Sequence, residues 1–163
     1  MLRELNAKIP GAPNFKYSEF IKSDTAIRLN ISNIPSREDQ WQNIERIATN
    51  VVQPVRNNFG STRITSGYRT PYLCSLIGSS TTSNHTRGEA ADIEPIRDDV
   101  RLIDVLEWVH DNCEFRELIA EYFPMGWIHI AFREGGNIRK VKLKDNKHHY
   151  SVVSLDYIKE IYK

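Results

Sequence analysis

Apolar side chains recur at helical spacing between residues 37 and 59 and predict the longest helix of the chain. The apolar positions of this stretch are Trp41, Ile44, Ile47, Ala48, Val51, Val52, Val55 and Phe59. Apart from two adjacent pairs, 47/48 and 51/52, they are three or four residues apart, as one buried helical face requires. Ser36 is expected to cap the helix, Asp39 lies in its first turn, and Gly60 is expected to end it. Pro54 should kink it, because proline removes one amide donor.

Shorter patterns predict a second helix and several strands. An amphipathic stretch indicates a helix over residues 99–112, and a single helical turn is expected at 18–21. Strands are predicted at 62–66, 90–93, 117–122, 127–133 and 138–143.

These elements predict the fold class. Segments 117–122 and 127–133 should form an antiparallel hairpin, to which segment 138–143 adds a further strand. Helices and strands in separate blocks are typical of an α+β domain, here a central, mostly antiparallel sheet with flanking helices. Residues 1–16 contain Pro10, Gly11 and Pro13 and are expected to form an irregular lead-in.

Composition narrows the classes of function. The 163 residues predict a single domain over residues 1–163, expected to be a monomer. Twenty-two basic against 21 acidic residues give a formal charge of +1, which argues against a nucleic-acid partner. No apolar run is long enough to span a membrane, and the first residues do not resemble a secretory signal. The localisation therefore stays open: the chain works in the cytosol or leaves the cell by a route other than a secretory signal. Cys74 and Cys113 are expected to be buried free thiols.

Two segments carry candidate metal ligands. In Trp127-Ile128-His129-Ile130, strand geometry directs the isoleucines to the core and His129 to the opposite face, together with Trp127. In the segment from Ser83 to Asp92, a loop holds His85 and the following strand ends near Asp92. Two imidazoles and one carboxylate suit Zn²⁺, and three protein ligands leave a position open for water, as in catalytic sites. Taken alone, a histidine on a strand is more often structural, so the local pattern leaves both interpretations open.

The motifs Ser-x-His-x-x-Gly-x-Ala-x-Asp, Trp-x-His and the upstream Ser-Gly-Tyr-Arg resemble those of the zinc D-alanyl-D-alanine carboxypeptidase family. That family includes phage endolysins that cut L-alanyl-D-glutamate bonds, and it shares its fold with the Hedgehog signalling domain. The resemblance covers about residues 15–135 and includes Tyr17-Ser18-Glu19-Phe20 near its start. It implies a Hedgehog/DD-peptidase-like fold. It also makes cytoplasmic synthesis with phage-type release to the cell wall one localisation that fits.

The resemblance also implies roles for individual residues. His85, Asp92 and His129 match the zinc ligands of the family. Arg69 matches an arginine that faces the substrate near the metal, although without the motif a surface salt bridge would be the favoured explanation. Three further residues are assigned to substrate binding: Ser83, Tyr68 and Trp127. For Ser83, a turn hydroxyl is the simpler alternative.

One position departs from the family pattern. The catalytic acid or base usually stands three residues before the last ligand, where this chain has Gly126. We nominate Glu121 instead: if the hairpin connection has five residues, Glu121 lies opposite Trp127 and on the face of His129. The alternatives are Glu94, two residues after Asp92, and a purely structural ion pair for Glu121.

The resemblance implies a zinc metallopeptidase that cuts D-amino-acid-containing bonds in the stem peptides of peptidoglycan by zinc-activated water, either as a D,D-carboxypeptidase or as an endolysin-type endopeptidase. Arg69 would stabilise the developing oxyanion, and a carboxylate would transfer the proton. The alternative is a catalytically inactive zinc-containing module that binds the cell wall or belongs to a phage particle, and Gly126 is the feature that favours it.

Overall fold

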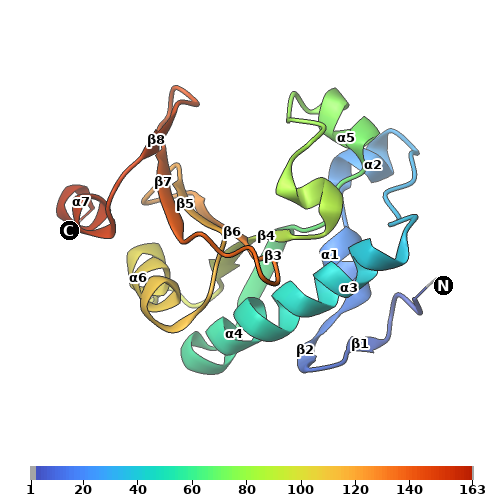
Figure 1. Ribbon diagram of the computed structural model, residues 1–163, viewed down its shortest axis with the longest axis horizontal. Coiled ribbons are helices and arrows are strands. Elements are labelled where there is room, and N and C mark those ends of the chain that lie inside the picture. Colours follow the sequence, from blue (N-terminus) through green and yellow to red (C-terminus); the bar gives the residue numbers. More distant parts are fainter. Residues whose placement is uncertain (1–2, 163) are drawn as a thin grey trace.

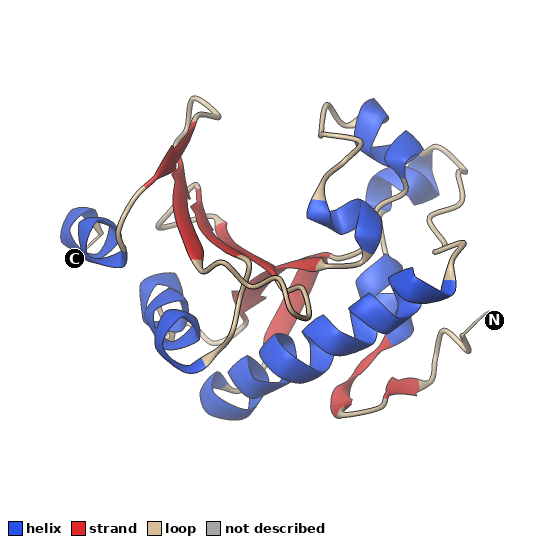
Figure 2. Ribbon diagram, viewed as in Figure 1, coloured by secondary structure: helices blue, strands red, loops and turns tan. Residues whose placement is uncertain are grey.

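The structure is a computed structural model and describes residues 3–162. A mixed sheet of six strands forms its centre (Figures 1 and 2). In spatial order the strands are β3 (Thr62–Ser66), β4 (Ala90–Pro95), β6 (Trp127–Ala131), β5 (Glu117–Glu121), β7 (Lys140–Lys144) and β8 (Tyr150–Val152). The pairing of β5 with β7 is parallel, and the other four pairings are antiparallel. The predicted α+β class with a mostly antiparallel sheet is confirmed.

The N-terminal segment is more regular than the sequence predicts. β1 (Lys8–Ile9) and β2 (Ala12–Lys16) pair as a small antiparallel sheet, so the expectation of an irregular lead-in is wrong for these residues. Ala12 and Phe15 are fully buried, and this burial outweighs the turn-forming residues between the strands. The short helices α1 (Tyr17–Ile21) and α2 (Asp24–Arg28) follow, the first where a helical turn is predicted.

The long predicted helix forms in three consecutive parts: α3 (Glu38–Ile47), a π-helical segment (Ala48–Val52) and α4 (Gln53–Phe59). Seven of the eight predicted apolar positions are buried, and Phe59 is partly exposed. Pro54 falls in the first turn of α4, where the wider π-helical turn before it accommodates the missing amide donor. Gly60 ends the helix with φ +83°. The cap differs from the prediction: the helix begins at Glu38, and the Gln40 side chain accepts the amides of Ser36 and Arg37.

The remaining helices are α5 (Pro71–Leu76), a 3₁₀ helix (Asn84–Arg87), α6 (Leu102–Asn112) and α7 (Leu155–Ile161). α6 begins three residues later than predicted. Among the described residues, no helix is both long and apolar enough to cross a membrane.

The two faces of the sheet have different neighbours. α3, α4 and α6 pack against the face that carries Ile93, Ile128 and Ile130, which are fully buried. The opposite face is flanked on one side by the segment that contains α5 and the 3₁₀ helix, and on the other by β7 and β8 (Figure 1). This second face holds the candidate site.

Candidate metal centre and its cleft

Asp92 and His129 are brought together by the pairing of β4 with β6, in which they are direct register partners. Partners in an antiparallel pair lie on the same face, so both side chains point away from the core, which receives Ala91 and Ile130. His129 Nδ1 lies 2.8 Å from Asp92 Oδ1. The predicted orientation of His129 is confirmed.

His85 reaches the same point from the 3₁₀ helix. At the start of that helix, the hydroxyl of Ser83 accepts a hydrogen bond from the backbone amide of His85. Gly88 ends the helix with φ +73°. An added Cβ on Gly88 would lie 2.4 Å from the carbonyl oxygen of Gln40, so only glycine fits at this turn into β4. The ring of His85 is held by Nδ1, which lies 2.6 Å from the carbonyl oxygen of Gly67. Because a carbonyl only accepts, Nδ1 carries the proton and the lone pair of Nε2 faces the other two residues.

The three candidate ligand atoms form a small triangle. His85 Nε2 lies 3.1 Å from His129 Nδ1 and 3.3 Å from Asp92 Oδ1. Tetrahedral zinc with bonds of about 2.0–2.2 Å would separate its ligand atoms by roughly 3.3–3.6 Å, so the three edges of 2.8, 3.1 and 3.3 Å would widen slightly around the ion. The two nitrogens and one oxygen fit a zinc ion in number and type.

The charges of the triad also suit a divalent cation. Burial lowers the pKa of His85, which favours the neutral ring. Burial alone would raise the pKa of Asp92, but its close polar contacts with His85 and His129 hold it well below its usual range. A neutral imidazole and an ionised carboxylate are the forms that bind metal.

Arg69 supports the carboxylate from behind. Its Nη2 lies 3.0 Å from Asp92 Oδ2, and its Nε donates to Ser66 Oγ at 2.9 Å. The oxygen of Asp92 that faces the histidines is Oδ1, so the arginine occupies the other oxygen. Outer contacts of this kind fix the orientation of a metal ligand. Arg69 therefore combines the ion pair that one interpretation predicts with a place beside the triad that the resemblance predicts.

The triad lies at the base of a cleft of about 740 Å³, between the α5 side and the β7–β8 side. The cleft also takes in the predicted residues Arg69, Ser83, Glu121 and Trp127. Tyr68 is not brought there: its side chain is 2% exposed and packs in the core. Among the described residues, the Trp127 indole Nε1 is the one buried side-chain polar atom without a hydrogen-bond partner.

Two carboxylates from β5 line the cleft. Glu121 is the register partner of Trp127, as the five-residue connection predicts, and Ile119 is the partner of His129. Glu121 and Glu117 are thus the diagonal neighbours of His129 on its own face. The rival candidate, Glu94, pairs with Arg63 and does not line the cleft.

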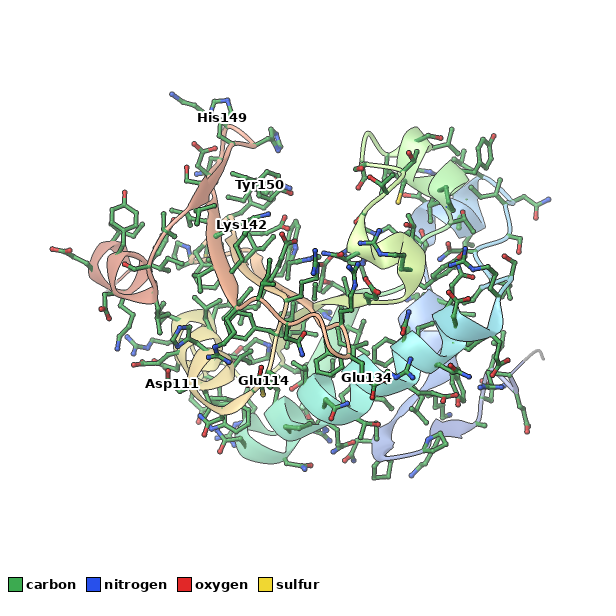
Figure 3. The ribbon with its side chains drawn as sticks, in the orientation of Figure 1. Asp111, Glu114, Glu134, Lys142, His149 and Tyr150 are labelled. Carbon is green, nitrogen blue, oxygen red and sulfur yellow. The ribbon has the colours of Figure 1, made fainter. Side chains whose placement is uncertain are left out.

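The sequence analysis missed the part of the cleft wall that β7, β8 and the loop between them form, across from α5. Lys142, Lys144, His148 and Tyr150 all line it. Figure 3 shows Lys142 and Tyr150 on the side of the β7–β8 hairpin that faces α5, and His149 at its tip. The alternation of lysine with apolar residues from Lys140 to Lys144 is the pattern that could have indicated this wall.

A protein-family model described as Peptidase M15 matches residues 13–131 of the chain. No curated protein matches the chain. The matched segment includes the whole triad together with Arg69 and Glu121, and it ends at the last residue of β6. β7, β8 and α7 lie beyond it.

Proposed function

The chain belongs to the Peptidase M15 family, and on that premise we propose that it is a zinc metallopeptidase that hydrolyses D-amino-acid-containing bonds in the stem peptides of peptidoglycan. The observation that carries the proposal is the convergence of His85, Asp92 and His129 within 4.8 Å of one another, in a cleft that Glu121 also lines. These three residues would hold the zinc. When bound, the ion lowers the pKa of a water ligand toward about 7 and polarises the scissile carbonyl.

Glu121 is our candidate for general base. Its Oε2 lies 2.9 Å from Lys144 Nζ, and no donor among residues 3–162 is paired with its Oε1. Oε1 can therefore take a proton from the attacking water and return it to the leaving amine. The neighbouring Glu117 is less suited, because Lys142 occupies its Oε1 at 2.7 Å and Asn84 its Oε2 at 3.1 Å.

Arg69 would act on the substrate with its remaining nitrogen. Its Nε and Nη2 are engaged by Ser66 and Asp92, which leaves Nη1 without a partner among the described residues. A guanidinium held in this way can donate to a carbonyl oxygen as negative charge develops there. Arg69 thus serves both Asp92 and the substrate in this proposal.

The shape of the site favours cleavage within a peptide over removal of its last residue. A second hollow of about 370 Å³ adjoins the main cleft and shares Arg69, Asp92 and Trp127 with it. It continues toward α2, past Lys22 and Thr25. The additional space beside Asp92 would accommodate further residues of a peptide substrate, as an endopeptidase requires.

The test is incubation of the zinc-loaded protein with purified muropeptides of defined structure, followed by mass spectrometry of the products. We expect paired fragments from an internal bond, lost on chelation and restored by zinc. The His129→Ala variant is the matched control for a contaminating hydrolase. If no muropeptide is cleaved, the chain is the non-catalytic module of the alternative hypothesis, and release of free D-alanine alone would contradict the endopeptidase assignment.

A further inference from the structure

Strand β7 of the β7–β8 hairpin lies beside β5 in the sheet and places a row of lysines next to the two carboxylates of β5. β7 runs parallel to β5, and its Lys140, Lys142 and Lys144 are the register partners of Glu117, Ile119 and Glu121. Register partners lie on the same face, so the three lysines share the face of the candidate site. Val141, between them, is buried on the core side. This strand lies outside the segment that the family model matches.

Lys144 is held on several sides. Its ammonium lies 2.9 Å from Glu121 Oε2 and 4.9 Å from the ring centroids of both Tyr122 and Tyr150. Only 16% of the Lys144 side chain and 8% of the Glu121 side chain are exposed. Burial opposes the charge, but the contacts with Tyr150, Glu121 and Tyr122 raise the pKa of Lys144 above its ordinary value. Lys144 is therefore a fixed cation beside the candidate base.

The neighbouring pair shows why Glu121 depends on this lysine. Glu117 has two anchors, Lys142 on Oε1 and Asn84 on Oε2, so the loss of one still leaves it a hydrogen-bond partner. Among the described side chains, Lys144 is the donor paired with Glu121. A buried carboxylate that loses its cation is left with an unpaired charge and turns toward solvent. That rotation would remove Oε1 from the position that a base needs.

We propose that Lys144 is a positioning residue for Glu121, and that Tyr122 and Tyr150 hold its ammonium in place. The hairpin thereby completes the catalytic wall with residues that the family-matched segment does not contain. The inference rests on the proposed function, since it assigns Glu121 as the base.

The test compares two lysines of one strand, Lys144 and Lys140. Lys144→Met should lower kcat on a cleaved muropeptide by about 10- to 100-fold, the usual effect of losing an outer partner of a reacting group, with little change in KM. Lys140→Met removes an exposed lysine four residues earlier on the same strand, outside the cleft, and should leave kcat unchanged. Lys144→Arg keeps the cation and should recover most of the activity. In a Glu121→Gln background, Lys144→Met should cause no further loss, because both changes act through one group.

Two results would overturn the inference: a Lys144→Met variant as active as Lys140→Met, or a full additional loss in the Glu121→Gln background. Crystal structures of the metal-free wild type and Lys144→Met give a readout without turnover, in which the Glu121 carboxylate should be displaced in the variant. An unmoved carboxylate would contradict the proposal. If Lys144→Met does not fold, Tyr150→Leu at the exposed edge strand should lower kcat, and a normal kcat would count against the role of Lys144. A wild type that cleaves no muropeptide overturns the proposed function, and the metal-free structures then decide the positioning of Glu121.

Discussion

Gly126 lies so close to Glu121 that a Cβ added to the glycine would be 1.8 Å from the Glu121 carbonyl oxygen. The same Cβ would be 2.9 Å from the Cβ of Tyr122. No residue with a side chain can occupy this turn without moving the backbone of β5. The departure from the family pattern at this position is therefore imposed by the hairpin, and the hairpin places Glu121 itself on the face of the triad.

The first prediction concerns this contact. Gly126→Ala should destabilise the protein by roughly 1–3 kcal/mol or more, the range for a side chain forced into a packed site. Chemical unfolding measures the change, and Ser151→Ala on the exposed strand β8 is a mild control. If the variant is as stable as the wild type, the turn accommodates a side chain at position 126, and the steric argument for glycine is wrong.

The second prediction is one zinc per chain, measured by elemental analysis of the folded protein. His85→Ala, Asp92→Ala and His129→Ala should each lose most of it, because each removes one corner of the triangle. His110→Ala is the control, since His110 lies on α6 beside Asp111 and outside the cleft. Full occupancy in all three triad variants would rule out this site.

The third prediction separates the two roles of Arg69. Arg69→Ala should weaken zinc binding by about 10- to 100-fold, as loss of an outer partner of a metal ligand does. It should also lower turnover at saturating zinc, because the guanidinium no longer faces the substrate. Arg69→Lys keeps the charge without the two-pronged geometry and should restore zinc affinity better than turnover. Zinc affinity and kinetics that both match the wild type would refute the two roles together.

The fourth prediction tests the base directly. Glu121→Gln should keep its zinc and its fold while kcat falls by about 10²- to 10⁴-fold, the contribution of general acid–base catalysis. Glu94→Gln is the matched control, since Glu94 pairs with Arg63 outside the cleft. Equal losses in the two variants would remove Glu121 from the mechanism.

The fifth prediction is a pH dependence of stability at Glu89, which is buried between Arg87 and Arg133. Burial favours the protonated acid, but hydrogen bonds from the two arginines outweigh it and lower the pKa of Glu89 below its ordinary value. A carboxyl whose folded pKa is lowered stabilises the protein above its unfolded pKa of about 4.3, and loses that contribution as the pH falls through the folded pKa.

Glu89→Gln should therefore cost about 1.5–3 kcal/mol at pH 7, typical of hydrogen bonds to a charged group. Urea unfolding of the metal-free protein should show the difference shrinking below pH 4.3. Asp104→Asn, which breaks the exposed pair with Arg101, is the control and should cost about 0–1 kcal/mol. If the difference in unfolding free energy between the wild type and Glu89→Gln is constant from pH 7 to pH 3, the charge of Glu89 does not contribute to stability.

The sequence by itself determined the elements whose periodicity is enforced by burial. The apolar face from Trp41 to Phe59 predicted the long helix, and the alternation around His129 predicted which side of β6 faces the core. The register of Glu121 opposite Trp127 also followed, because the other register would have buried a carboxylate in the core. These patterns are local, and the hydrophobic effect acts on them wherever the rest of the chain lies.

Only the tertiary structure decided which distant groups meet. The hydrogen-bond donor to Glu121 is Lys144, which lies 23 residues later in the chain. The two residues meet because β5 and β7 pair in parallel, and no turn motif in the sequence predicts such a pairing. Tyr68 belongs to a recognisable motif, yet it packs into the core while its neighbour Arg69 turns to Asp92. Non-local contacts of this kind depend on how whole helices and strands pack together. A local sequence pattern predicts the conformation of one element and not which other element it contacts.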